Sequence, residues 1–305
     1  MPARYQDRTT LGRLYRETNG PQWHESDGWL SEAPIWSWYG VRTSGIRVYD
    51  RVQQLYLDGN NLEGAFPASA LQLGGLIRLF LDRNLLKGRL PTSGWDGVPE
   101  LLDLNIYSNQ LTGPIPAGLG KLTNLLTLWA WENGFSGPIP WQLGTLTELR
   151  ALLLFSNDLS GPIPPELGNL SNLVHLRLDD NQLSGPIPQE LGRLQNLTVL
   201  ALYVNSLSGP LPRELGNLRS LEELFVQGND LSGPVPPELG ELSELTRLSI
   251  GWNPGLTGPL PIELTNLERL KLFYWVNTGL CAPDDAAFQA WLATIEDHRG
   301  GPTCP

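Results

Sequence analysis

The sequence has few basic residues and very few lysines. Its 305 residues include 21 Lys and Arg against 32 Asp and Glu, a formal net charge of −11, and only three of the basic residues are Lys. Binding to nucleic-acid phosphates or to an anionic membrane surface needs clustered Lys and Arg, which this composition does not supply. We therefore predict no nucleic-acid partner.

Long apolar runs are also absent. No stretch approaches the roughly 18 consecutive apolar residues that a membrane-spanning helix needs, so we predict no membrane span. Residues 1–10 are polar and lack the apolar core of a secretory signal. We therefore expect no signal peptide in the chain as given.

The chain is equally poor in the patterns that build catalytic centres. Its three histidines, His24, His175 and His298, are far apart in sequence. Cys-x-x-Cys and His-Glu-x-x-His spacings are missing, and no Ser–His–Asp or Cys–His arrangement is recognisable. We predict that the protein is not an enzyme and that it has no catalytic residue, no metal site and no cofactor.

Leucine, glycine and proline dominate what is present, with 60 Leu, 33 Gly and 26 Pro. Proline recurs too often for long amphipathic helices, because it removes a helical hydrogen bond and clashes with the preceding turn. A hydrophobic content of 41% with 11 Trp still indicates a packed core. The combination predicts short elements at a fixed spacing.

Asparagine marks that spacing. Ten Asn residues lie at intervals of 24, 25 and then seven times 24 residues, and they are Asn60, Asn84, Asn109, Asn133, Asn157, Asn181, Asn205, Asn229, Asn253 and Asn277. Around them the frame Leu-x-x-Leu-x-Leu-x-x-Asn-x-Leu-x-Gly-x-Ile-Pro recurs with small variations. Leu-x-Leu alternates with period two, so each repeat predicts a short strand with its leucines inward. We expect ten such strands to stack in parallel, with the Asn amides satisfying the backbone of the turns.

This frame resembles the plant-type leucine-rich repeat over about residues 50–280. Receptor-kinase ectodomains and polygalacturonase-inhibiting proteins carry such repeats, and bacterial proteins do as well. The resemblance implies an α/β solenoid, a right-handed superhelix of about ten 24-residue repeats with a concave parallel sheet and helical caps at both ends. It also implies a recognition module, because the concave face of this family usually binds a protein, peptide or small ligand.

We interpret the two ends of the chain as caps that cover the open ends of the solenoid core. We expect an N-terminal cap at residues 1–50, the repeats at residues 51–280 and a C-terminal helical cap at residues 281–305. In the first cap, residues 9–18 predict a short helix, and Trp36 to Val41 resembles the cap of the family. Plant secreted members have a Cys pair there and this chain has none, which favours a bacterial relative.

The last cap contains the only two cysteines. Cys281 and Cys304 bracket a predicted helix whose apolar face is Phe288, Trp291, Leu292 and Ile295. A disulfide between them is the natural pairing, and two free buried thiols are the alternative. A disulfide favours a secreted or cell-surface location.

The outward positions of the predicted strands carry the functional signal. Of 30 such positions, 11 are aromatic, while the other 275 residues hold 15 aromatics. An apolar exposed face of this kind marks an interaction site. The candidate ligand-binding residues on the concave face are Tyr56, Phe80, Tyr107, Trp129, Trp131, Phe155, Arg177, Asp179, Tyr203, Phe225, Trp252, Phe273 and Trp275.

These residues predict a protein or peptide ligand that is apolar or aromatic with some basic groups. Three alternatives stay open. The face makes a homodimer or an adhesive contact, or it binds carbohydrate on its aromatic rings, or the rings merely pack on each other across the strands.

Overall fold

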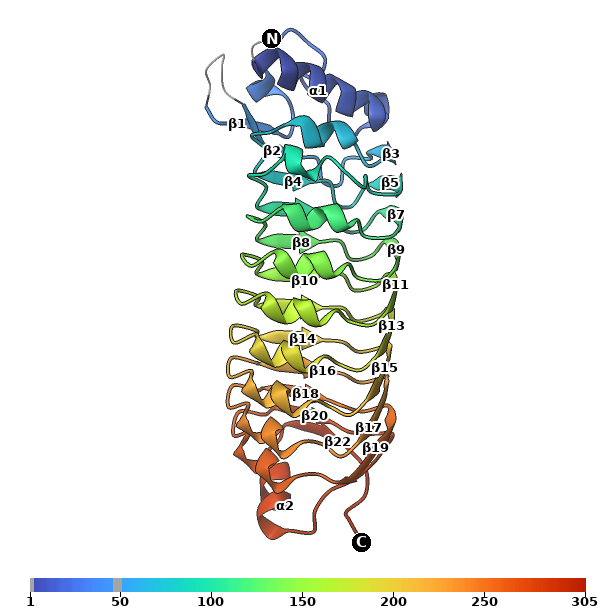
Figure 1. Cartoon of the computed structure of the whole chain (residues 1–305), viewed down its shortest axis with the longest axis vertical. Coiled ribbons are helices and arrows are strands. Elements are labelled where there is room, and N and C mark those ends of the chain that lie inside the picture. Colours follow the sequence, from blue (N-terminus) through green and yellow to red (C-terminus); the bar gives the residue numbers. More distant parts are fainter. Residues whose placement is uncertain (1–2, 46–50) are drawn as a thin grey trace. The chain divides into compact units, whose positions relative to one another are not determined.

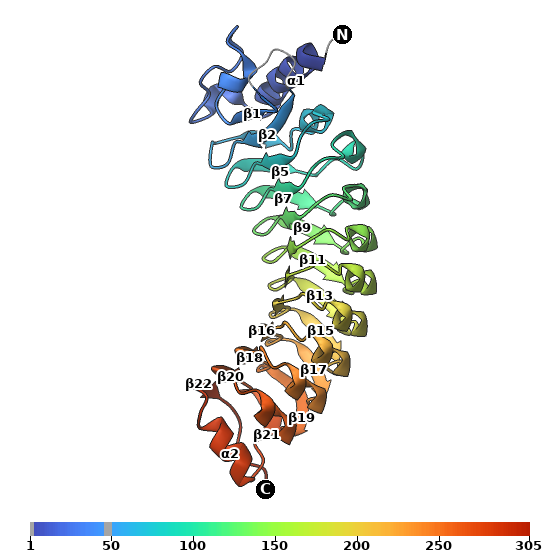
Figure 2. The same cartoon turned by 90° about the vertical axis from the view of Figure 1, so that its left-hand side faces the viewer.

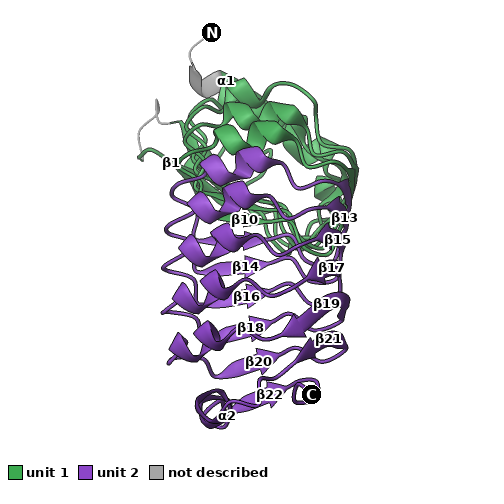
Figure 3. Ribbon diagram, turned by 60° about the horizontal axis from the view of Figure 1, so that its bottom comes forward, with its two compact units in different colours: residues 1–158 green, residues 159–305 purple. Residues whose placement is uncertain are grey.

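The computed structural model describes residues 3–45 and 51–305, which fall into two compact units, residues 1–158 and 159–305 (Figure 3). Both units repeat one pattern: a strand of the main sheet, a turn at Asn, a strand of a second sheet, and a short 3-10 helix (Figure 1). Within each unit the 3-10 helices stack on the side away from the main-sheet strands (Figure 2). The division into two caps around a repeat region stays a prediction.

The first unit begins with a helix, followed by two 3-10 turns and the strand β1 that pairs antiparallel with the first repeat strand. These elements are α1 (Ala3–Glu17), η1 (Gly20–Gln22), η2 (Ile35–Ser37) and β1 (Val41–Thr43). Its main-sheet strands are β2 (Val52–Tyr56), β4 (Arg78–Phe80), β6 (Asp103–Asn105), β8 (Thr127–Trp129) and β10 (Ala151–Leu153). Its other elements are β3 (Glu63–Ala65), β5 (Leu85–Gly88), β7 (Gln110–Gly113), β9 (Gly134–Gly137), η3 (Ala68–Gln72), η4 (Trp95–Gly97), η5 (Ala117–Lys121) and η6 (Trp141–Thr145).

The second unit continues the same order and ends in a helix and a last strand. Its main-sheet strands are β12 (His175–Arg177), β14 (Val199–Ala201), β16 (Glu223–Phe225), β18 (Arg247–Ser249), β20 (Leu272–Tyr274) and β22 (Asp297–Arg299). The second-sheet strands are β11 (Asp158–Gly161), β13 (Gln182–Gly185), β15 (Ser206–Gly209), β17 (Asp230–Gly233), β19 (Asn253–Pro259) and β21 (Thr278–Cys281). Its helices are η7 (Pro165–Asn169), η8 (Gln189–Arg193), η9 (Arg213–Asn217), η10 (Pro237–Glu241), η11 (Ile262–Asn266) and α2 (Ala286–Leu292).

The main-sheet strands pair in parallel with equivalent residues side by side. On β12 and β14, for example, Leu176 lies opposite Leu200, and both side chains are fully buried. Leucines that alternate along a strand all point to one face of the sheet, so they form a continuous core inside each unit. The predicted solenoid of parallel strands is confirmed.

The asparagine turns behave as the repeat frame predicts. Asn205 is representative: its Nδ2 donates to the carbonyl oxygens of Leu178 and Leu202 at 3.0 and 3.2 Å, and its Oδ1 accepts from the Leu183 amide at 2.9 Å. The residue before it, Val204, has a φ of 51°. The amide thus ties two consecutive repeats together and stabilises a left-handed residue at each turn.

The last repeat departs from the predicted frame. The segment from Asn253 to Leu256 contains one residue more than the same segment of other repeats, and the second sheet is irregular there. Asn253 therefore lies opposite Thr278, so Asn277 is not the tenth turn residue as predicted. The hydroxyl of Thr278 replaces the amide and donates to the Trp275 carbonyl at 2.7 Å.

The N-terminal helix is longer than the predicted 9–18. It starts at Ala3, and its Leu11 and Leu14 are buried as expected. Two contacts hold the earlier turns in place: Arg8 donates to backbone carbonyls including that of Ala33 at 2.6 Å, and Asp7 accepts from the Val52 amide at 3.0 Å.

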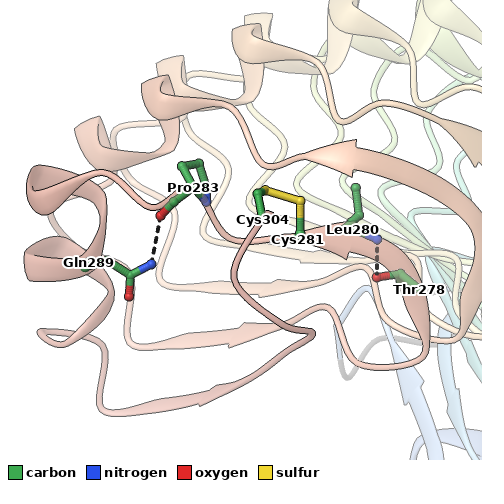
Figure 4. Close-up of a disulfide and its surroundings, with 6 residues drawn as sticks. All are labelled: Thr278, Leu280, Cys281, Pro283, Gln289 and Cys304. Carbon is green, nitrogen blue, oxygen red and sulfur yellow. Dashed lines mark hydrogen bonds between the residues drawn. A yellow bond between two sulfur atoms is a disulfide. The ribbon is translucent and has the colours of Figure 1, made fainter.

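The C-terminal helix α2 covers the end of the core. Asp285 caps it by accepting from the amides of Ala287 and Phe288 at 2.9 and 3.0 Å, and Phe288 is fully buried. Cys281 and Cys304 form a disulfide that joins β21 to the end of the chain (Figure 4).

Candidate functional site

The outward face of the main sheet is made of side chains that alternate with the core leucines. Besides the predicted positions, the residue directly before the first core position of each strand also points outward. Sequence reasoning missed this row, although the same period-two alternation marks it. Its members are Gln54, Arg78, Asp103, Thr127 and Ala151 in the first unit and His175, Val199, Glu223, Arg247 and Leu272 in the second.

Three predicted aromatic residues of the first unit form one stack. Trp131 lies between Tyr107 and Phe155, with ring centroids 4.1 and 4.9 Å apart and planes inclined by 8° and 9°. All three rings follow neighbouring strands at the same position of the repeat, so the stack runs across β6, β8 and β10. Both faces of the Trp131 ring are covered, and each of the three residues is only partly exposed.

Two unpaired polar atoms lie beside this stack. Asn105 on β6 and Trp129 on β8 are direct neighbours in the sheet. The Oδ1 of Asn105 and the Nε1 of Trp129 are both buried, and neither has a hydrogen-bond partner among residues 3–45 and 51–305. Buried polar atoms in native proteins are nearly always paired. An acceptor and a donor on adjacent strands match the N–H and C=O of a peptide group.

The remaining candidates of the first unit lie at its N-terminal end. Tyr56 and Phe80 contact edge to face, with centroids 5.0 Å apart. Beyond them Arg83 bridges two carboxylates, contacting Asp58 at 2.7 Å and Asp82 at 3.1 Å. Burial raises the pKa of the Asp82 carboxyl, while its hydrogen bonds act in the opposite direction. The Arg83 guanidinium partly neutralises the negative charge of these two carboxylates.

In the second unit, Arg177 and Asp179 form an internal pair. The guanidinium donates to both carboxylate oxygens at 3.1 and 2.8 Å, and to the hydroxyl of Tyr203 at 3.2 Å. Asp179 is only 1% exposed, so its carboxylate is covered by the arginine. Tyr203 in turn contacts Phe225 edge to face at 6.5 Å. Asp179 thus orients Arg177, and its carboxylate is not exposed on this face.

Two predicted site residues face the core. Phe273 and Trp275 are 0% and 2% exposed, because the extra residue in the preceding repeat places them at the two leucine positions. The chain end also covers Trp275: a side chain built on Gly300 would lie 1.7 Å from its ring. The outward residues of this repeat are Tyr274 and Val276. A period of 24 residues counted from Leu256 reaches Leu280 and gives this register, whereas the same period counted from Asn253 reaches Asn277 and gives the wrong one.

Among the described residues, no helix combines the length and the apolar character needed to cross a membrane.

Family models identify the repeats. A model of the leucine-rich repeat region matches residues 133–292, and a shorter leucine-rich repeat model matches residues 100–122. The chain belongs to the leucine-rich repeat family. Over 128 residues this leucine-rich repeat chain is 36% identical to the LRR receptor-like serine/threonine-protein kinase GSO2 of Arabidopsis thaliana. That match covers 41% of the chain and 10% of the kinase.

Solved structures share the same repeat architecture. The LRR ectodomain of the receptor kinase GASSHO1/SCHENGEN3 from Arabidopsis thaliana, in complex with CASPARIAN STRIP INTEGRITY FACTOR 2, matches with a TM-score of 0.87 and 33% identity over 97% of this chain and 38% of that one. The Arabidopsis receptor kinase HAESA, in complex with the peptide hormone IDA and a co-receptor, matches with a TM-score of 0.60 and 28% identity over 91% of this chain and 58% of that one.

A plant ice-binding protein matches over nearly the whole of both chains, 99% of this one and 98% of the other, with a TM-score of 0.81 and 27% identity. The leucine-rich repeat chain spans about a tenth of the length of the curated relative GSO2 and 38% of the length of the solved GASSHO1 chain. These relatives are plant proteins, so they give no support to the expected bacterial relationship.

Proposed function

We propose that this leucine-rich repeat chain is a non-enzymatic recognition module that binds an extended peptide segment, free or within a protein, on the outward face of its first unit. The observation that carries the proposal is a pair of side-chain atoms without partners, Asn105 Oδ1 and Trp129 Nε1, on two residues that are direct neighbours in the sheet. Both atoms are buried in the ligand-free chain, so binding requires the two side chains to turn outward. A peptide N–H then donates to the first atom and a peptide C=O accepts from the second, which satisfies both.

The ring stack supplies the apolar part of this site. The edges of Tyr107, Trp131 and Phe155 line the sheet beside the polar pair, so apolar side chains of the ligand would pack there. Plant relatives of similar architecture bind peptide hormones, which supports the same ligand class. The net charge of −11 favours a ligand with some basic groups.

The alternatives are less well supported. A sugar platform needs an open ring face, and both faces of Trp131 are covered by neighbouring rings. Self-association through the aromatic face predicts a dimer whose mass depends on concentration, which light scattering measures directly.

The test selects extended peptides from a random displayed library against the intact chain. The selected peptides are then measured against Trp129→Leu, which keeps an apolar residue and removes the donor; Leu153 occupies the same row in the next repeat. Trp141→Ala is the matched control, since Trp141 is 54% exposed on η6, away from the sheet. We expect Trp129→Leu to weaken binding about tenfold and the control to leave it unchanged. Equal affinity for both variants would contradict the proposal.

Ice binding is a second candidate, favoured by the full-length match to a plant ice-binding protein. The second sheet carries a partly exposed serine at the same place in consecutive repeats of the second unit, namely Ser184, Ser208 and Ser232. Regularly placed hydroxyls are suited to ordering water. Inhibition of ice recrystallisation by the parent, lost in a Ser208→Lys variant, would support this function, and no inhibition by the parent would exclude it.

A further inference from the structure

A groove of about 800 Å³ lies on the second unit, where its second-sheet strands lead into the stacked 3-10 helices η7, η8 and η9 (Figure 3). We call it the proline groove. Exposed proline rings at the equivalent place of three consecutive repeats line it, namely Pro162, Pro186 and Pro210. Beneath them lie the buried side chains of Ile163, Ile187 and Leu211. The groove is therefore largely apolar although it opens to solvent, and its volume is in the range of ligand sites.

Proline also explains why a groove forms at this place. Pro164, Pro188 and Pro212 precede the three helices and are extended, with φ of −63°, −64° and −65°. Having no N–H, they cannot donate a hydrogen bond to the next repeat, so the second sheet does not continue through them. A depression remains between the sheet and the helices.

One edge of the proline groove is acidic. Glu190 and Glu214 line it from the second positions of η8 and η9. Glu214 contacts Arg213 at 3.3 Å, whereas Glu190 makes no ion pair within the described residues. The equivalent positions of η7, η10 and η11 are also glutamates, Glu166, Glu238 and Glu263. Five consecutive repeats of the second unit thus carry a carboxylate at the same place.

The fold brings these glutamates together without requiring them. A Cβ built on Gly192 would lie 2.8 Å from the Glu214 Cβ, so adjacent 3-10 helices stack closely. Carboxylates on neighbouring repeats therefore repel each other. In η5 and η6 of the first unit the same position holds Gly118 and Gln142, so the repeat accepts uncharged residues there. A cationic partner would relieve the repulsion along the edge.

A smaller hollow of about 250 Å³ lies on the next two helices, η10 and η11, and its lining includes Glu238, Glu241 and Glu263. Glu241 is paired with Arg219, whereas Glu238 and Glu263 make no ion pair among residues 3–45 and 51–305. No acidic, histidine and cysteine side chains of these residues are grouped closely enough to hold a metal ion. The hollow therefore suits the larger charged end of a Lys or Arg side chain.

We propose that the proline groove and this hollow bind an extended basic segment of a protein partner. Apolar side chains of the segment pack on the proline rings, and its Lys or Arg side chains lie beside Glu190 and Glu238. This surface belongs to the second unit and is independent of the peptide site proposed on the outward face of the first.

A segment in the polyproline II conformation matches the repeat. Its rise of about 3.1 Å per residue places every third side chain roughly 9.3 Å apart. Equivalent positions two repeats apart, such as Glu190 and Glu238, are separated by roughly 9.6 Å if adjacent repeats follow the usual strand spacing. A basic residue at every third position would therefore meet the glutamates of alternate repeats.

The test measures binding of three fluorescein-labelled peptides to the intact chain by fluorescence polarisation. The peptides consist of four Lys-Pro-Val, Gln-Pro-Val or Glu-Pro-Val triplets and differ only in charge. We expect saturable binding of the Lys peptide that weakens with ionic strength, about tenfold weaker binding of the Gln peptide and none of the Glu peptide. Equal affinities for the Lys and Gln peptides, or no saturable binding of the Lys peptide, would overturn the proposal.

A pair of double variants locates the binding. Glu190→Gln with Glu238→Gln should weaken binding of the Lys peptide about tenfold and leave the melting temperature unchanged, because Gln142 occupies this position in η6. Glu222→Gln with Glu268→Gln is the matched control, since it removes two charges from exposed residues of the same unit that line neither the groove nor the hollow. Equal losses in the two double variants would mean that only net charge attracts the peptide and would contradict the proposal.

The apolar part of the surface is tested by Pro186→Arg. The substitution removes a ring and places a cation in the groove, and Arg89 at the equivalent position of the first unit shows that the repeat accepts arginine there. We expect loss of Lys-peptide binding with an unchanged melting temperature. Undiminished binding by the folded variant would exclude the proline groove as the site.

The Lys peptide also separates this proposal from the peptide site of the first unit. Trp129→Leu should leave binding of the Lys peptide unchanged while it weakens binding of library-selected peptides. Failure of the Lys peptide to bind would remove the proline groove and leave the peptide site intact.

Discussion

The ring of Trp131 is stacked on the ring of Tyr107, with centroids 4.1 Å apart and planes only 8° from parallel. The alternation of the strand predicts that the ring of Trp131 points to solvent. Instead, its outward side chain packs sideways on its neighbours in the adjacent repeats. The aromatic face of the first unit is therefore partly a structural feature of the sheet as well as a candidate binding surface.

This packing gives Trp131→Ala a measurable cost in stability. Two stacked pairs are lost, each worth about 0.5–1.5 kcal/mol, so we expect the free energy of unfolding to fall by about 1–3 kcal/mol. Urea denaturation followed by circular dichroism measures the change. An unchanged midpoint would show that the rings are held apart in solution.

The shifted register of the last repeat makes opposite predictions for two adjacent aromatic residues. Trp275 is buried at a core position, so Trp275→Ala should destabilise the chain by about 3–5 kcal/mol. Tyr274 faces outward, and Tyr274→Ala should cost about 1 kcal/mol or less. Thermal melting of the two variants compares them directly, and equal losses would refute the shifted register.

Asp7 gives the stability a pH dependence that can be predicted in sign. Its carboxyl is 1% exposed, and burial raises its pKa above the ordinary value, although the Val52 amide and Arg51 oppose the rise. A raised folded-state pKa means that the contribution of Asp7 to stability is largest below the unfolded pKa, about 3.9, and is lost as pH rises through the folded value.

Asp7→Asn removes this titration and keeps an oxygen that can accept from Val52. The melting temperature of the variant minus that of the parent should therefore increase between pH 3 and pH 7, reflecting the charge that the parent must bury. A difference that stays constant across this range would mean that Asp7 does not titrate with a raised pKa in the folded chain.

Much of the fold can be predicted from the sequence, because the same pattern of Leu, Asn, Gly and Pro recurs in each repeat. The Leu-x-Leu strands, the Asn turns up to Asn253 and the face of α2 that carries Phe288 all appear as the pattern predicts. Where one residue is inserted after Asn253, a fixed period fails, and with it the assignment of Phe273 and Trp275. The register of a strand is set by its backbone pairing with the neighbouring strand. The sequence period predicts that pairing only as long as no residue is inserted.

The candidate sites were less accessible from sequence. Alternation identifies outward positions such as Trp131 and Trp129 but not whether their polar atoms are paired or their rings stacked. The burial of Asp179 beneath Arg177 likewise depends on which side chains adjoin across the sheet.

The most direct test of peptide recognition by the first unit measures both stability and affinity for one variant, Asn105→Leu. Leucine removes the unpaired buried Oδ1, so we expect the free energy of unfolding to stay the same or rise. Isothermal titration with a library-selected peptide should show affinity reduced about tenfold, because the acceptor for a peptide N–H is gone. A variant that unfolds as the parent does and binds the peptide equally well would contradict the account.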